Sequence, residues 1–164
     1  MTIEISAGWS PGAIGDVVGA HGRYYSRNWG FGAVFEAKVA GEMAAFVHRY
    51  DPDRDRLFMA SSEAGFLASL TIDGSDPDLP PRQAHLWWSI AADAARGTGV
   101  GGALMGAAMD FLSSAGYRSC YLTTFKGLDP ARRLYERHGF QLVSEAKDET
   151  WGVTVNEQRF EAAL

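Results

Sequence analysis

Ala95-Arg96-Gly97-Thr98-Gly99-Val100-Gly101-Gly102 is the stretch that decides the fold. It follows the apolar run Leu86-Trp87-Trp88-Ser89-Ile90 and precedes apolar residues at helical spacing, from Leu104 to Leu112. A strand, a glycine-rich turn and a helix form an anion site, because amides at the helix start stay unpaired and the helix dipole favours negative charge. Glycine lets the backbone approach a ligand closely, and Arg96 adds a forked donor suited to phosphate oxygens. The stretch therefore predicts a phosphate-binding turn.

The composition indicates a folded, acidic chain. The 164 residues are 46% hydrophobic and 12% aromatic, which argues against disorder and supports one domain, residues 1–164, with a sizeable core. The net charge of −5 gives no electrostatic support for binding nucleic acid or an anionic membrane. Cys120 is the only cysteine, and neither a signal peptide nor a bilayer-length apolar run is visible, so we expect a cytoplasmic protein. No spacing of His, Cys, Asp or Glu suggests a metal site, and we expect none.

Hydrophobic periodicity orders the chain as two helices, a β-meander, and then β-turn-α-β-α-β-β. The expected strands are 2–6, 56–61, 65–72, 85–90, 119–125, 140–144 and 153–160, and the expected helices are 14–25, 31–50, 100–115 and 129–138. Ser10 and Asp129 are placed to cap the first and last helices. The strand at 119–125 is almost continuously apolar or β-favouring, which predicts an interior position. The pattern predicts an α/β fold with a mixed sheet and a parallel βαβ crossover in its second half.

The glycines of the turn also satisfy G-x-G-x-x-G, the fingerprint of dinucleotide-binding folds. That fingerprint requires an acidic residue about 20 positions further on, at the end of the next strand. The strand at 119–125 contains no acid, which disfavours a nicotinamide-dependent oxidoreductase. A P-loop fails more directly, because no Gly-Lys-Ser/Thr closes the turn.

A second pattern in the turn, Arg96-x-x-Gly99-x-Gly101, resembles the Arg/Gln-x-x-Gly-x-Gly/Ala signature of the GCN5-related N-acetyltransferase (GNAT) superfamily. Downstream, Ala131-Arg132-Arg133-Leu134-Tyr135-Glu136-Arg137-His138-Gly139-Phe140 resembles the family motif A-x-x-L-Y-x-x-x-G-F. A subgroup of acetyltransferase domains, fused behind MarR-type DNA-binding domains, is similar at Trp151-Gly152-x-x-Val155-x-Glu157-Gln158, His21-Gly22-x-Tyr24-Tyr25 and Phe35-Glu36-Ala37. The resemblance covers nearly the whole chain. It implies a mixed, mostly antiparallel twisted sheet of about six to seven strands, flanked by helices.

The resemblance implies an N-acetyltransferase that passes the acetyl group of acetyl-CoA (coenzyme A) to a primary amine of a small molecule or peptide, by direct attack in a ternary complex. The implied pyrophosphate contacts are Arg96, Gly97, Thr98, Gly99, Val100, Gly101 and Gly102. Ser89, Ile90 and Ala91 match the strand positions that bind the pantetheine arm, and Arg132 is either a phosphate contact or a solvated helix residue. Tyr135 matches the catalytic general acid, and a phenol and an alkyl thiol differ in acidity by only about 1.5 pKa units.

The chain departs from the family at Leu128, where many members carry Asn, and at Ala92, near which many carry an acid. The general base is therefore open, and the candidates are His21, Glu36, His85 and Asp93. We expect the acceptor pocket between the first two helices and the meander, with His21, Tyr25, Trp29 and Glu36 as substrate contacts. Its aromatic candidates are Tyr24, Tyr25, Trp29, Phe31, Phe35, Trp87 and Trp88, of which at most one of the adjacent tyrosines is buried.

The missing acid and the resemblance to regulator-fused domains also motivate an alternative function: a non-catalytic module that senses acyl-CoA or a small molecule. The expected partner in both cases is a small molecule or peptide, with a homodimer left open. A catalyst and a sensor differ in whether an acetylated amine is formed.

Overall fold

The computed structural model describes residues 1–164 and holds seven strands in one sheet, in the order β1-β2-β3-β4-β5-β7-β6. The strands are β1 (Glu4–Ala7), β2 (Arg56–Ser62), β3 (Gly65–Asp73), β4 (Gln83–Ala91), β5 (Ser119–Phe125), β6 (Gln141–Asp148) and β7 (Val155–Ala163). All neighbouring strands run antiparallel except β4 and β5, which run parallel. The mixed sheet and the crossover are confirmed, and β5 lies in the interior as its apolar sequence predicts.

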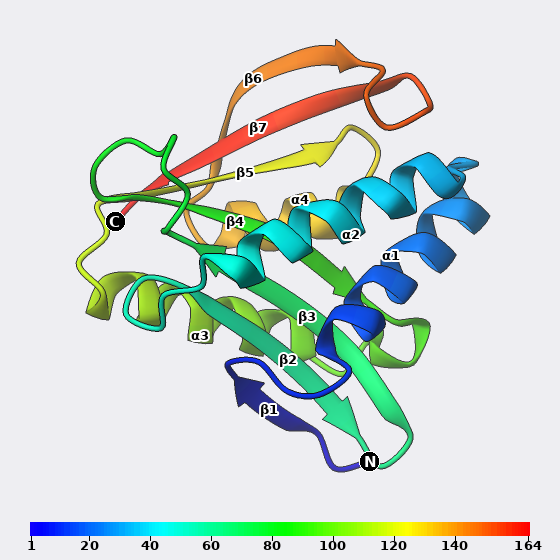
Figure 1. The fold of residues 1–164 in the computed structure, drawn as a ribbon, viewed down its shortest axis with the longest axis horizontal. Coiled ribbons are helices and arrows are strands. Elements are labelled where there is room, and N and C mark those ends of the chain that lie inside the picture. The colour runs from blue at the N-terminus through cyan, green and yellow to red at the C-terminus, as the bar shows by residue number, and fades with distance from the viewer.

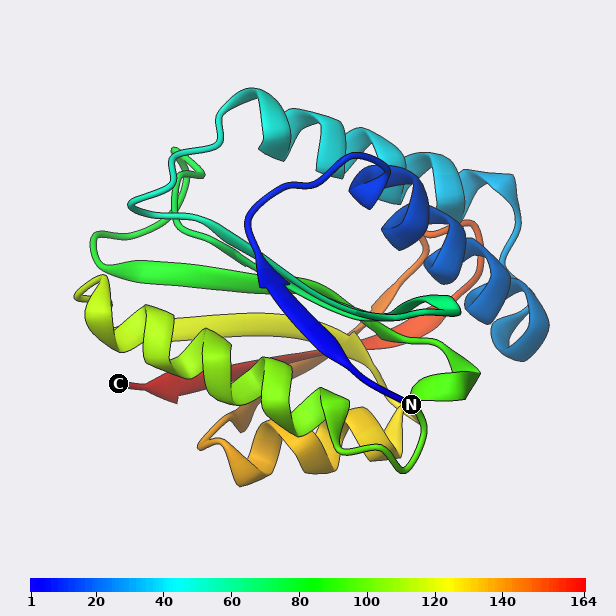
Figure 2. The ribbon, with the colours of Figure 1, turned by 90° about the horizontal axis from the view of Figure 1, so that it is seen from below.

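Helices cover both faces of the sheet (Figures 1 and 2). The α-helices are α1 (Ala13–Trp29), α2 (Ala33–His48), α3 (Val100–Ser114) and α4 (Asp129–Arg137), with a 3₁₀ turn, η1 (Asp93–Ala95), between β4 and α3. Figure 2 shows α1 and α2 on one face and α3 and α4 on the other. None of the helices combines the length and the apolar composition that crossing a membrane requires.

Each face of the sheet has its own hydrophobic core. On the α3 side, Leu104, Met105 and Leu112 pack against Leu70 and Leu86 of the sheet. On the α1–α2 side, Val17, Phe35 and Met43 pack with aromatic residues, among them Trp88 and Phe125. The alternation of strand side chains between the two cores fixes the register, because a slip of one residue would exchange the two faces.

Three sequence predictions about element ends are wrong. α1 begins at Ala13 behind Gly12, because the carbonyl of Ser10 accepts the Ala13 amide in a preceding turn and Ser10 caps nothing. Asp129 is the first residue of α4 and not its cap, although a carboxylate in the first turn still suits the helix dipole. The strand expected at 140–144 instead runs to Asp148, because β6 is an exposed edge strand in which no alternation between core and solvent marks the end.

Five flat side-chain groups form a column across β7, β5 and β4. The guanidinium of Arg159 lies 3.8 Å from the ring centre of Tyr121, which stacks on His85 at 4.2 Å. His85 stacks on Trp87 at 4.3 Å, and Trp87 stacks on Trp88 at 4.0 Å. Burial lowers the pKa of His85 from 6.5 to about 3, and Nε2 of this ring has no hydrogen-bond partner. His85 is therefore a neutral stacking residue of the sheet.

We expect replacement of His85 by Phe to reduce the acid sensitivity of the fold. An imidazole whose pKa is 6.5 when unfolded and about 3 when folded gains its proton only on unfolding, so acid favours the unfolded chain between these values. Each such histidine makes the free energy of unfolding fall by about 1.4 kcal/mol per pH unit. Urea titrations at pH 7 and pH 5 should show a smaller pH-dependent loss for His85→Phe than for the parent. An equal loss would contradict the assignment.

Candidate functional site

The principal cavity has a volume of about 460 Å³ and opens where β4 and β5 part. Only Gln83–His85 pair with Ser119–Tyr121, so the two strands have no ladder contact along their carboxyl-terminal halves. Figure 1 shows them diverging toward the carboxyl-terminal end of β4. Residues of α1 and α2 line the cavity on one face of the sheet, and residues of α3 and α4 line it on the other. The cavity therefore passes through the sheet and can be reached from both layers.

The glycine-rich turn lies at one end of this cavity. Gly97 and Gly99 adopt φ angles of 72° and 80°, a left-handed conformation that side chains rarely tolerate. Their amides have no acceptor within the protein, and the amides of Gly101 and Gly102 lie in the first turn of α3, where no intrahelical acceptor exists. The turn thus presents four unpaired N–H groups at a helix N-terminus, which is an arrangement suited to phosphate.

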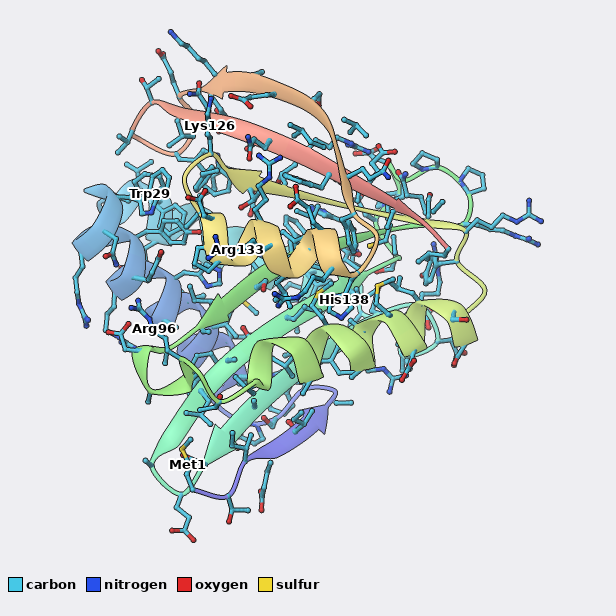
Figure 3. All side chains as sticks on the ribbon, turned by 180° about the vertical axis from the view of Figure 1, so that it is seen from behind. Met1, Trp29, Arg96, Lys126, Arg133 and His138 are labelled. Carbon is cyan, nitrogen blue, oxygen red and sulfur yellow. The ribbon has the colours of Figure 1, made fainter.

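Arg96 and Gly101 line the cavity beside these amides. Figure 3 shows Arg96 at the N-terminal end of α3. The Arg96 guanidinium lies 3.0 Å from Asp93 and is mostly exposed, so an anion can replace this partner at little cost. Arg132 does not line the cavity; its Nε donates to Glu136 and its guanidinium lies over the Phe160 ring.

A bulge in β4 shapes the adjacent cavity wall. Ser69 pairs with Ile90 and Thr71 with Trp87, so the single residue Leu70 faces the two residues Trp88 and Ser89. Trp88 has a φ of 50°, which is a strained conformation for a bulky side chain. The Ser69 hydroxyl donates a 3.1 Å hydrogen bond to the Trp88 carbonyl and holds it in place. The bulge and the parting strands bring Ser89, Ile90 and Ala91 to the cavity surface.

Tyr135 enters the cavity from α4 and lies next to Ser89 of β4. Its side chain is only 5% exposed, and burial raises the pKa of its phenol, which the neighbouring Ser89 side chain partly opposes. Tyr25 reaches the same cavity from α1, on the opposite face, and the proximity of Tyr135 adds to the rise in the Tyr25 pKa that burial causes. Two neutral phenols thus face the cavity from the two sides of the sheet.

His21 is the one general-base candidate that lines the cavity. Its Nδ1 lies 2.8 Å from the Val17 carbonyl, which can only accept, so Nδ1 carries the proton and Nε2 keeps its lone pair. Burial lowers the pKa of His21 from 6.5 to about 4, and the ring is therefore neutral at physiological pH. His85 is buried in the column of stacked rings, outside the cavity.

Two substrate contacts predicted from the sequence lie outside the cavity lining. Trp29 packs on Phe125 at 5.8 Å and against Gly127 in the turn after β5, so it covers the end of the aromatic cluster. Glu36 is exposed and packs over α1 at Gly22, where a Cβ would lie only 2.9 Å from its carboxyl group. His21 and Tyr25, the other two predicted contacts, do line the cavity.

The cavity brings most of the aromatic candidates together, and two of its aromatic lining residues were not predicted. Tyr24, Tyr25, Phe35, Trp87 and Trp88 line the cavity, whereas Trp29 and Phe31 do not. Of the two adjacent tyrosines only Tyr25 is buried, as predicted. The aromatic lining residues that sequence reasoning missed are Phe125, at the end of β5, and Trp151, in the β6–β7 loop. A signal for Phe125 existed, because it ends the strand that was expected to lie next to the glycine turn's strand.

Comparisons with known proteins identify a family and a similar fold. The model of the Acetyltransferase (GNAT) family matches residues 19–140. The fold is similar to an acetyltransferase of the GNAT family from Staphylococcus aureus (11% identity, 99% of each chain, TM-score 0.78) and to a GCN5-related N-acetyltransferase from Kribbella flavida (17% identity, 99% of this chain and 98% of that one, TM-score 0.75). A ribosomal-protein-alanine N-acetyltransferase from Brucella melitensis is also similar (13% identity, all of both chains, TM-score 0.74). A search among curated proteins found no match. At such identities the structural likeness concerns the fold alone.

Two matched substitutions in β3 compare a hydroxyl that stabilises the bulge through a hydrogen bond with a buried hydroxyl that has no partner. Ser69→Ala removes the donor to the strained Trp88 carbonyl and should lower the free energy of unfolding by about 1 kcal/mol. Thr71→Val removes a buried hydroxyl that has no partner, so it should leave stability unchanged or raise it slightly. Denaturant titrations of both variants measure the difference. Equal destabilisation by the two substitutions would contradict a holding role for Ser69.

Proposed function

This chain belongs to the acetyltransferase (GNAT) family, and we propose that it transfers the acetyl group of acetyl-CoA to a primary amine of a small molecule or peptide. The observation that carries the proposal is one cavity, open between β4 and β5, that is lined both by Arg96 and Gly101 of the glycine turn and by the buried residue Tyr135. An anion site and a proton donor that border the same cavity suit a long phosphorylated thioester.

The residues of the site fit coenzyme A. The amides of Gly97, Gly99, Gly101 and Gly102, together with Arg96, would hold the pyrophosphate. The edge of β4 from Ser89 to Ala91 has no ladder partner on its β5 side, so its polar backbone groups can bind the amides of the pantetheine arm. The apolar remainder of the channel would exclude water from the reacting end of the cofactor.

When bound, acetyl-CoA would supply the acetyl group as a thioester: the amine nitrogen forms a bond to the carbonyl carbon, and the carbon–sulfur bond breaks. Tyr135 would donate its proton to the leaving sulfur and recover a proton from solvent. The nitrogen loses one proton to solvent, so an amide and a free thiol are formed with no net gain or loss of protons. Backbone N–H groups of the β4 bulge would stabilise negative charge on the acetyl oxygen.

Burial suits Tyr135 to this role. Desolvation raises its pKa above the ordinary value of 10.0, so the phenol keeps its proton in neutral and mildly alkaline solution. A neutral donor with this acidity can protonate a developing thiolate without being ionised beforehand. No acidic residue lines the cavity, and burial lowers the pKa of His21 to about 4, which makes this histidine a weak base. The amine therefore has to reach the site already deprotonated or lose its proton to solvent.

A sensing module on the same fold is the second candidate, and the absence of acidic residues from the cavity lining favours it. Such a module would bind acetyl-CoA and release no thiol with any amine. The resemblance to domains fused behind MarR-type regulators stays a prediction.

Tyr135→Phe should leave the affinity for acetyl-CoA within about twofold of the parent and lower kcat roughly 10²-fold or more, because general-acid catalysis contributes about 10²–10⁴-fold. Binding is measured by calorimetry, and turnover is measured by thiol release with an amine. Tyr121→Phe is the matched control, since Tyr121 lies outside the cavity lining and the substitution preserves its stacking on His85. Unchanged turnover in Tyr135→Phe would exclude the general-acid role.

Arg96→Gln should weaken acetyl-CoA binding about tenfold, because a charge-assisted hydrogen bond to phosphate is lost. The melting temperature should stay the same, since the exposed ion pair of Arg96 with Asp93 contributes little to stability. Arg118→Gln is the control, because Arg118 is exposed beyond the far end of α3. If both variants bind acetyl-CoA equally well, the cofactor does not use the turn as proposed, and titration with NAD then tests the dinucleotide alternative.

A further inference from the structure

The part of the cavity on the α1–α2 side has a different character from the part beside the glycine turn. Seven aromatic residues from five segments line it: Tyr24, Tyr25, Phe35, Trp87, Trp88, Phe125 and Trp151. Neither Asp nor Glu occurs anywhere in the cavity lining, and the charged residue that does, Arg96, belongs to the phosphate end. An acceptor bound here meets ring faces and edges, with few polar groups.

A protonated amine would be poorly held in this compartment. Moving an ammonium ion out of water costs several kcal/mol unless a carboxylate compensates it, whereas a desolvated cation–π contact returns about 2 kcal/mol. The Trp151 ring already makes a cation–π contact within the protein, because the Lys38 ammonium lies 4.5 Å from the centre of this ring. The compartment therefore favours an uncharged ligand.

Three further carboxylates, those of Glu157, Glu36 and Asp93, lie outside the cavity lining. Glu157 accepts a hydrogen bond from the Trp151 indole, and burial raises the pKa of its carboxyl group. Glu36 is exposed and packs over Gly22 outside the cavity lining. Asp93 pairs with Arg96 and with Arg27, at 3.0 and 3.6 Å. None of the three lines the cavity.

His21 is the polar group best suited to receive an amine in this compartment. Its Nδ1–H donates to the Val17 carbonyl. Its Nε2 has no hydrogen-bond partner in the protein and is not fully buried. Among the hydroxyl groups of the cavity lining, that of Ser69 already donates to the Trp88 carbonyl. A neutral imidazole that is held on one side and open on the other is an acceptor for an N–H group.

On the basis of the function proposed above, we propose that the acceptor is a small aromatic or apolar primary amine, bound as the uncharged base, with its NH₂ group donating to Nε2 of His21. The aromatic residues bury the apolar body of the amine, and the hydrogen bond to His21 leaves the nitrogen lone pair available for attack. Polyamines and peptide N-termini that carry further charged or polar groups are poor acceptors, because those groups would be buried without partners.

A panel of acceptors at saturating acetyl-CoA tests the substrate class. We expect 2-phenylethylamine to be acetylated with a kcat/KM at least about 100-fold above that of 1,4-diaminobutane or of a tripeptide with a free N-terminus, because the burial of one phenyl ring is worth a factor of this order. Equal or better acetylation of the diamine or the tripeptide would overturn the inference and leave the proposed function standing. Thiol release with none of the amines would overturn the proposed function itself.

Two substitutions at position 21 test the hydrogen bond. His21→Asn can still donate to the Val17 carbonyl but has no acceptor at the position of Nε2, so kcat/KM for 2-phenylethylamine should fall about tenfold, mainly through KM. His21→Gln places an amide near the position of Nε2 and should stay within about threefold of the parent. Affinity for acetyl-CoA should be unchanged in both variants. Equal activity of the Asn variant and the parent, with both folded, would remove His21 from the proposal.

Discussion

The separation of β4 from β5 is the constraint on which the rest of the site depends. Three residues of each strand pair, and beyond them two parallel strands in the interior of the sheet lose their ladder. Buried backbone groups without partners are costly, so such a gap persists only if the surrounding structure enforces it and a ligand or water can satisfy it. The bulge at Trp88 and Ser89, the hydrogen bond from Ser69 and the crossover through α3 provide that enforcement. The cavity, the exposed edge of β4 and the approach of helices from both faces all follow from the parted strands.

The sequence predicted the elements next to the parted strands, α3 and β5, better than the cavity residues of α1, α2 and the β6–β7 loop. The start of α3 at Val100 and the bounds of β5 agree with the structure, because glycines and a continuous apolar run leave a clear local pattern. Glu36 and Trp29 were misplaced for a different reason. Whether a helix residue faces a cavity depends on how α1 and α2 cross, and that depends on Gly22, which lets the Glu36 side chain lie against α1. Trp151 was missed because it reaches the cavity from a loop whose position is set by the edge hairpin β6–β7.

The two ends of the cavity differ in polarity. The phosphate end offers amides, a helix dipole and Arg96 to an anion, and it needs no side-chain acid. The other end buries aromatic rings around one neutral histidine, where a charge of either sign would be costly. A cofactor that is highly charged at one end and neutral at its reactive end matches this gradient. Under the proposed function, the glycine turn would determine which end of the cofactor reaches Tyr135.

The column of stacked rings gives the cavity wall an optical property. Trp87 and Trp88 are parallel to within 16° with their ring centres 4.0 Å apart, and both line the cavity. Indole transitions at this separation couple electronically, so the pair should contribute a strong near-ultraviolet circular dichroism signal. The coupling depends on the mutual orientation of the two rings, and one of them sits at the strained residue of the bulge. The signal of this tryptophan pair should therefore report the shape of the cavity wall.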